Sequence, residues 1–134
     1  MELNGETLRF IREHCKDDVR SLALQAPKYP GVDMPVALTQ IAGRQAAAEK
    51  IPSWHEEEGV LYPRHLSLEQ CSSEATARYK ASIIPEPSSG TLTDLTGGFG
   101  IDCAFLSPRF HHVTYVERQE VLCEIASHNF PLLG

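Results

Sequence analysis

Two carboxylates flank a run of glycines, and they are the residues of this sequence best suited to chemistry. Asp94 ends a short apolar segment, a glycine-rich stretch follows it, and Glu117 ends the next apolar segment. Glycines this dense destabilise helices and strands, so they indicate a tight backbone turn. The residues of this turn that could contact a ligand are Thr96, Gly97, Gly98 and Gly100. Asp94 could orient the turn and hold an ammonium group, while Glu117 could accept hydrogen bonds from both hydroxyls of a ribose.

The residues around the glycines exclude one common phosphate site and weaken the case for another. A P-loop needs Gly-Lys-Ser/Thr after the turn, and the sequence has no such triplet. In the dinucleotide fingerprint G-x-G-x-x-G, Cys103 would occupy the place of the third glycine. A turn that only connects a strand to a helix is the other interpretation, in which Glu117 is a solvated residue at a helix start.

The elements that must position these residues form a strand–helix–strand–helix series. The sequence predicts strands at 91–95 and 113–117 and helices at 101–106 and 118–130. Short links in this order predict a parallel pair of strands with a right-handed crossover. The glycine turn then lies between the end of a strand and the start of a helix, where open α/β sheets bind ligands.

The first half of the chain has helical periodicity instead. We expect a helix over 5–26, capped by Asn4 and stopped by Pro27, and a second helix over 34–50. The connector after it holds Trp54 and should fold back on these helices. The apolar residues expected to face the second helix and this connector are Leu8, Ile11, Val19 and Leu22.

A third helix is predicted over 72–83, with Ser72 as its cap and Glu74 in its first turn. The stretch "PEPSSG" at 85–90 then breaks the chain.

Composition limits the classes of protein further. A chain of 134 residues with 42% hydrophobic and 22% charged residues is an ordinary globular protein, and no apolar stretch is long enough to span a membrane. The first residues lack the features of a signal peptide, so we expect a cytoplasmic protein. Four cysteines without a CxxC pair predict neither disulfides nor a metal site. The net charge of −6 argues against a nucleic-acid surface on this chain.

Two stretches resemble parts of a known family. "DLTGGFG" and "VTYVER" look like the first cofactor motif and the following acidic strand of class I S-adenosylmethionine-dependent methyltransferases, although Thr96 replaces the first glycine of D-x-G-x-G-x-G. The upstream stretch "CSSEATARYKA" is similar to the cap and helix that precede this motif in trimethylguanosine synthase. Nearly the whole chain resembles bacterial methyltransferases that carry a THUMP-like domain farther downstream.

The resemblance implies an α/β fold in two parts. Residues 1–66 would form a helical domain with its connector, and residues 67–134 would form the first β-α-β-α portion of a Rossmann-like methyltransferase domain. The implied cofactor is S-adenosylmethionine, and the implied cofactor-binding residues are Ser72, Glu74, Asp94, Thr96, Gly97, Gly98, Gly100, Glu117 and Arg118. No residue of the sequence is implied as catalytic or as a metal ligand.

The resembled enzymes carry their catalytic motif, Asn or Asp followed by Pro-Pro and an aromatic residue, after further strands. This sequence has no such motif. We therefore expect the N-terminal part of a methyltransferase whose parent acts on RNA through other regions, with weak or absent cofactor binding and no activity by itself. A two-stranded sheet has open edges, so we also expect a homo-oligomer, a two-fold dimer formed by the segment after Thr91. The alternative is a non-catalytic helical interaction module in which the glycines form only a structural turn.

Overall fold

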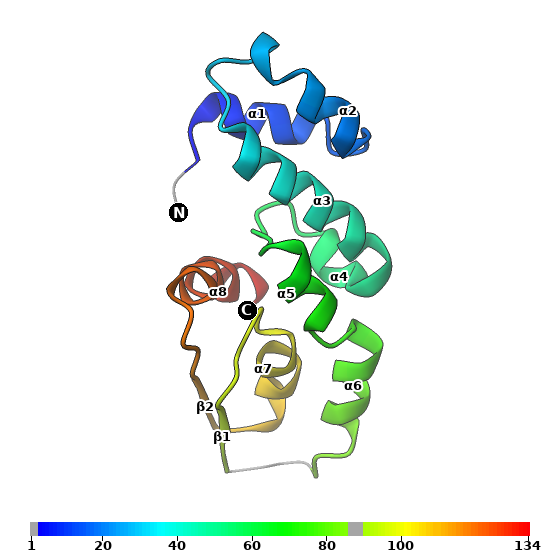
Figure 1. The fold of residues 1–134 in the computed structure, drawn as a ribbon. Coiled ribbons are helices and arrows are strands. Elements are labelled where there is room, and N and C mark those ends of the chain that lie inside the picture. Colours follow the sequence, from blue (N-terminus) through cyan, green and yellow to red (C-terminus); the bar gives the residue numbers. More distant parts are fainter. Residues whose placement is uncertain (1–2, 86–89) are drawn as a thin grey trace.

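The computed structural model describes residues 3–85 and 90–134. It has two parts, and the long helix over 34–50 contributes buried residues to both (Figure 1). The N-terminal elements are α1 (Gly5–Glu13), α2 (Val19–Leu24), the 3-10 helix η1 (Ala26–Lys28), α3 (Met34–Lys50), α4 (Pro52–His55), α5 (His65–Gln70) and α6 (Glu74–Ser82). The C-terminal elements are β1 (Thr91–Asp94), α7 (Ile101–Leu106), the 3-10 helix η2 (Ser107–Arg109), β2 (His112–Tyr115) and α8 (Glu120–Leu133). Most of the predicted chain break at 85–90 lies outside the described residues.

The helix predicted over 5–26 is wrong as a single helix, because two helices occupy this stretch. Asn4 caps α1 as expected and accepts from the amide of Thr7 at 2.8 Å. The segment between the helices is closed by the contact between His14 Nδ1 and Asp17 Oδ2 at 2.7 Å, and Asp18 accepts from the amide of Ser21 to begin α2. Polar side chains that bond the local backbone in this way compete with helix continuation.

A first hydrophobic core joins α1 and α2 to α3. Its buried residues are Phe10, Leu22, Met34, Ala37 and Ile41, with Ile11 and Val19 packed against them. The prediction for Leu22 is confirmed, but Leu8 is 45% exposed and does not belong to this core. Trp54 is also absent from it, so the predicted contact with Trp54 is wrong, although Leu8 and Ile11 line one cavity with Tyr62 of the same connector.

A second core contains Trp54 and crosses residue 66, where the sequence predicts a domain boundary. Its buried residues are Ala47, Ile51, Trp54, Val60, Tyr62, Leu68, Ala77, Phe99, Ile101 and Ile125. The rings of Trp54 and Phe99 meet edge to face at 5.0 Å, so the connector packs against the residue in the middle of the glycine turn. The boundary itself stays a prediction, but the two parts are held together by apolar contacts.

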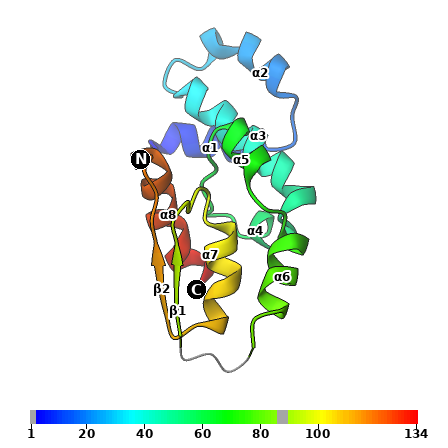
Figure 2. The same cartoon turned by 60° about the horizontal axis from the view of Figure 1, so that its bottom comes forward.

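The α/β prediction is confirmed for the second part, where β1 and β2 form a parallel pair with Thr91 opposite His112 and Asp94 opposite Tyr115. In Figures 1 and 2, α7 lies between the strands and α6. Tyr115 packs edge to face on Phe130 of α8 at 5.4 Å, so the helices cover one face of the pair. The other face carries Thr91, Thr93, His112 and Thr114, all exposed. None of the described helices is long and apolar enough to cross a membrane.

Candidate functional site

The glycine turn has a backbone conformation that requires glycine at two positions. Gly98 has φ of +55° and Gly100 has φ of +92°, both in the left-handed region. At Gly97 the reason is space instead, because a Cβ atom there would collide with the ring of Tyr115. The tight turn predicted from the sequence is therefore present between β1 and α7.

Glu117 fastens this turn to the end of the neighbouring strand. Its Oε1 accepts a hydrogen bond from the amide of Gly98 at 3.0 Å, and its Oε2 accepts from the amide of Gln119 at 2.6 Å. The amide hydrogen bonds from Gln119 and Gly98 lower the pKa of Glu117 below its usual range, so the side chain is a carboxylate at neutral pH. Glu117 is thus held at the carboxyl end of the strands in its charged form.

Asp94 and Tyr115 hold the same turn from two other sides. Oδ1 of Asp94 accepts from the amide of Thr96 at 3.1 Å, which is the orienting role that the sequence predicted. The hydroxyl of Tyr115 donates to the carbonyl oxygen of Gly98 at 2.5 Å, and burial raises the pKa of this tyrosine. Tyr115 was not identified from the sequence, since a tyrosine in a strand is more often a packing residue.

A cleft of about 400 Å³ opens beside the turn. Its lining includes the predicted residues Ser72, Asp94, Thr96, Gly97, Gly98, Gly100 and Glu117, which come from three separate segments of the chain. Glu74 and Arg118 do not line the cleft, although the sequence placed them in the same group.

Glu74 instead connects α6 to α4. One of its oxygens accepts from the amide of Ser53 at 2.9 Å and from the hydroxyl of Ser53 at 2.7 Å, and the other accepts from Arg78 Nε at 2.8 Å. Burial alone would raise the pKa of Glu74, but the hydrogen bonds from Ser53 and Arg78 lower it overall. The cap of α6 is Ser73, whose side chain accepts from the amide of Thr76 at 3.1 Å, so the prediction of Ser72 as the cap is wrong.

Ser72 does not cap α6, and its side chain instead belongs to a polar cluster at the wall of the cleft. Its hydroxyl donates to Asp102 Oδ2 at 3.1 Å and accepts from Lys80 Nζ at 3.1 Å. Lys80 also donates to both carboxylate oxygens of Asp102, at 3.1 and 3.2 Å. The sequence offered a signal for Asp102, which follows the last glycine of the turn by two positions, but no local pattern points to Lys80.

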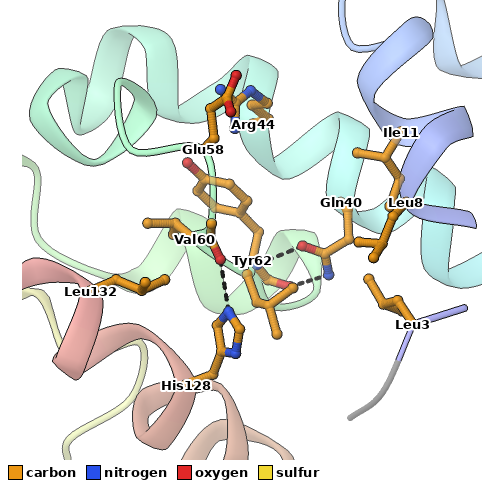
Figure 3. A pocket seen from close by; sticks show the side chains of 12 residues that line it. Leu3, Leu8, Ile11, Gln40, Arg44, Glu58, Val60, Tyr62, His128 and Leu132 are labelled. Carbon is orange, nitrogen blue, oxygen red and sulfur yellow. Dashed lines mark hydrogen bonds between the residues drawn. The ribbon is translucent and has the colours of Figure 1, made fainter. Parts of the chain in front are cut away.

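A second cavity, of about 310 Å³, lies between α1, α3 and α8 and contains none of the predicted site residues (Figure 3). Gln40 lies at one side of this cavity. Its Oε1 accepts from the amide of Tyr62 at 2.7 Å, and its Nε2 donates to the carbonyl oxygen of Tyr62 at 2.9 Å. The hydroxyl of Tyr62 is buried and has no hydrogen-bond partner among the residues that the structure describes. Burial raises the pKa of Tyr62 to about 12, although the nearby charge of Arg44 lowers it in part.

Among residues 3–85 and 90–134, no group of three or more His, Cys, Asp or Glu side chains could hold a metal ion.

Comparison with known proteins gives one informative likeness. No family model and no curated protein sequence matches the chain. The fold is similar to the crystal structure of a "putative methyltransferase" from Porphyromonas gingivalis W83, with a TM-score of 0.76 and 30% sequence identity. The match covers 95% of this chain and 31% of that chain, so this chain spans about a third of the length of that protein.

Proposed function

We propose that this chain is the cofactor-binding beginning of a class I S-adenosylmethionine-dependent methyltransferase. The observation that carries the proposal is the contact between Glu117 and Gly98, which places a carboxylate and a glycine turn together at the carboxyl ends of two parallel strands. Ligands of open α/β sheets bind at this edge. The likeness to a protein described as a methyltransferase supports the same reaction class.

The residues of the cleft fit such a cofactor. The two carboxylate oxygens of Glu117 accept backbone hydrogen bonds from Gly98 and Gln119, and a carboxylate has about four lone-pair sites, so Glu117 can also accept from a ribose hydroxyl. A Cβ atom at Gly98 would meet only the carbonyl oxygen of Thr96 at 3.7 Å, so this side of the turn leaves room for a ligand. When bound, S-adenosylmethionine supplies an activated methyl group on a sulfonium.

The role of the chain within such an enzyme is binding and orientation. Methyl transfer depends on holding the acceptor atom in line with the sulfonium methyl, and we assign no residue of this chain to the acceptor. We therefore propose weak cofactor binding and negligible methyl transfer for the chain alone. For the whole protein we propose an RNA substrate and the THUMP-like family, on the resemblance described above, and a cytoplasmic location.

Titration of the 134-residue chain with S-adenosylmethionine, followed by NMR chemical-shift changes, tests the proposal. Glu117→Ala should weaken binding about ten- to a hundredfold, because charge-assisted hydrogen bonds worth roughly 1.5–3 kcal/mol are lost. Glu49→Ala is the matched control, since Glu49 is an exposed acid of α3. Equal affinities in the wild type and Glu117→Ala, or no binding at all, would favour a helical interaction module in which the glycines form only a turn.

A further inference from the structure

We propose that Lys80, together with Ser72 and Asp102, forms the subsite for the amino-acid end of the cofactor, a zwitterion with an ammonium and a carboxylate. This inference rests on the proposed function and adds to it a residue that the sequence did not identify. Ser72 and Asp102 both line the cleft, and Lys80 Nζ lies within 3.2 Å of both side chains. The wall of the cleft therefore carries a positive and a negative group side by side.

The donors and acceptors of the cluster match a zwitterion. Lys80 Nζ directs its three hydrogens to Ser72 and to both carboxylate oxygens of Asp102, so a ligand carboxylate would take over one of the two bonds to Asp102. Asp102 accepts one bond from Ser72 and two from Lys80 and retains one lone pair, on Oδ1, for a ligand ammonium. The bonds among the three side chains fix the lysine in place, which lowers the entropy lost on binding.

The other charges of the cleft show why the lysine matters. Asp94, Asp102 and Glu117 are all acids of the lining, and they repel a carboxylate. Within the part of the chain that the structure describes, no Lys or Arg lines the cleft, and Lys80 contacts the lining through Ser72 and Asp102. A ligand with a carboxylate thus needs Lys80 more than a ligand without one.

A purely structural role explains the cluster less well. The side chain of Lys80 is 44% exposed and that of Asp102 is 33% exposed, and ion pairs this accessible to water contribute little to stability. α6 and α7 are already joined in the second core through the buried residues Ala77 and Ile101. The fold does not need the ion pair to keep these helices together.

Two ligands that differ only in the carboxylate provide the test: S-adenosylmethionine and decarboxylated S-adenosylmethionine. We expect the wild-type chain to bind the first about tenfold more tightly, which is the scale of one charge-assisted contact. Lys80→Met should remove this preference by weakening only S-adenosylmethionine, and Lys80→Arg should restore part of it. Lys28→Met, which removes an exposed lysine of η1, should keep the preference.

The outcomes separate the subsite from the proposed function. Equal weakening of both ligands by Lys80→Met, or an unchanged preference, would overturn the subsite while leaving the function standing. Asp102→Asn should weaken both ligands, because both carry the ammonium, and an unaltered affinity for both would also contradict the subsite. Failure of the wild-type chain to bind either ligand would overturn the function and the subsite together.

Discussion

Glu117 accepts a hydrogen bond from the amide of Gly98 at 3.0 Å, and this contact joins the end of the second strand to the turn that follows the first. The carbonyl of the same glycine is held by Tyr115, two residues earlier on the same side of the strand. Both backbone polar groups of Gly98 are therefore held by β2 and the two residues that follow it. The turn is set before any ligand arrives.

Tyr115→Phe should destabilise the fold by about 1 kcal/mol, because the partly buried carbonyl of Gly98 loses its donor while the ring still packs on the turn. Amide hydrogen exchange should rise locally at Gly98 and Gly100. Urea unfolding with exchange measured by NMR checks both effects. Tyr79→Phe is the control, since Tyr79 is 67% exposed; a change of the same size there would show that the contact with Gly98 is not the cause.

Gly97→Ala should cost about 1–3 kcal/mol, because the new methyl group collides with the ring of Tyr115 and must displace it. Gly5→Ala, in open space at the start of α1, should instead be neutral or stabilising by about 0.5–1 kcal/mol. Thermal unfolding of the two variants checks the contrast. An unchanged melting temperature in Gly97→Ala would mean that the turn and the ring are not in contact.

Tyr62→Phe should leave stability unchanged or raise it by about 1–3 kcal/mol, the opposite of Tyr115→Phe, because its buried hydroxyl has no partner in the described part of the chain (Figure 3). The raised pKa of Tyr62, about 12, also predicts a pH effect. The folded chain holds this proton more tightly than the unfolded chain, so stability falls as pH rises from about 10 to 12. Across this pH range the free energy of unfolding should fall less in the variant than in the wild type. A variant less stable than the wild type at pH 7 would indicate that the Tyr62 hydroxyl does have a hydrogen-bond partner.

Glu74→Ala should destabilise the fold by about 1–3 kcal/mol through the loss of the bonds to Ser53 and Arg78. Under conditions in which the variant is folded, its affinity for the cofactor should equal that of the wild type, because Glu74 lies outside the cleft. Glu49→Ala serves as the control for removal of one acid. A selective loss of cofactor affinity without a loss of stability would restore the role that the sequence predicted for Glu74.

The exposed face of the strand pair, with its open edges, leads us to propose a two-fold homodimer of this chain. The residues of this face are Thr91, Thr93, His112 and Thr114, and Leu95 is 74% exposed beyond it. Light scattering at micromolar concentration should give twice the chain mass of 14.9 kDa. Thr93→Lys should shift the protein to monomer, whereas Leu24→Lys, on exposed α2, should not. A wild-type monomer at these concentrations would contradict the proposal.

Local sequence determined the glycine turn and the limits of α3 and α7. Three glycines after Asp94 predicted a tight turn because only glycine adopts the left-handed conformation without strain, and Gly98 and Gly100 do so here. Asn4 marked the start of α1 because a cap bonds an amide only three residues away. The parallel pair followed from the order of elements, whose connections can close in few ways.

Tertiary structure alone decided which polar residues face the cleft. Glu74 and Asp102 both lie in the first turn of a helix, so sequence patterns cannot separate them. The packing of α4 against the second core brings Ser53 to Glu74, while the approach of α6 to α7 brings Lys80 to Asp102. Long-range packing also decides that Trp54 contacts Phe99 and not α1. These contacts join residues far apart in the chain, and their partners are fixed only when the apolar surfaces meet.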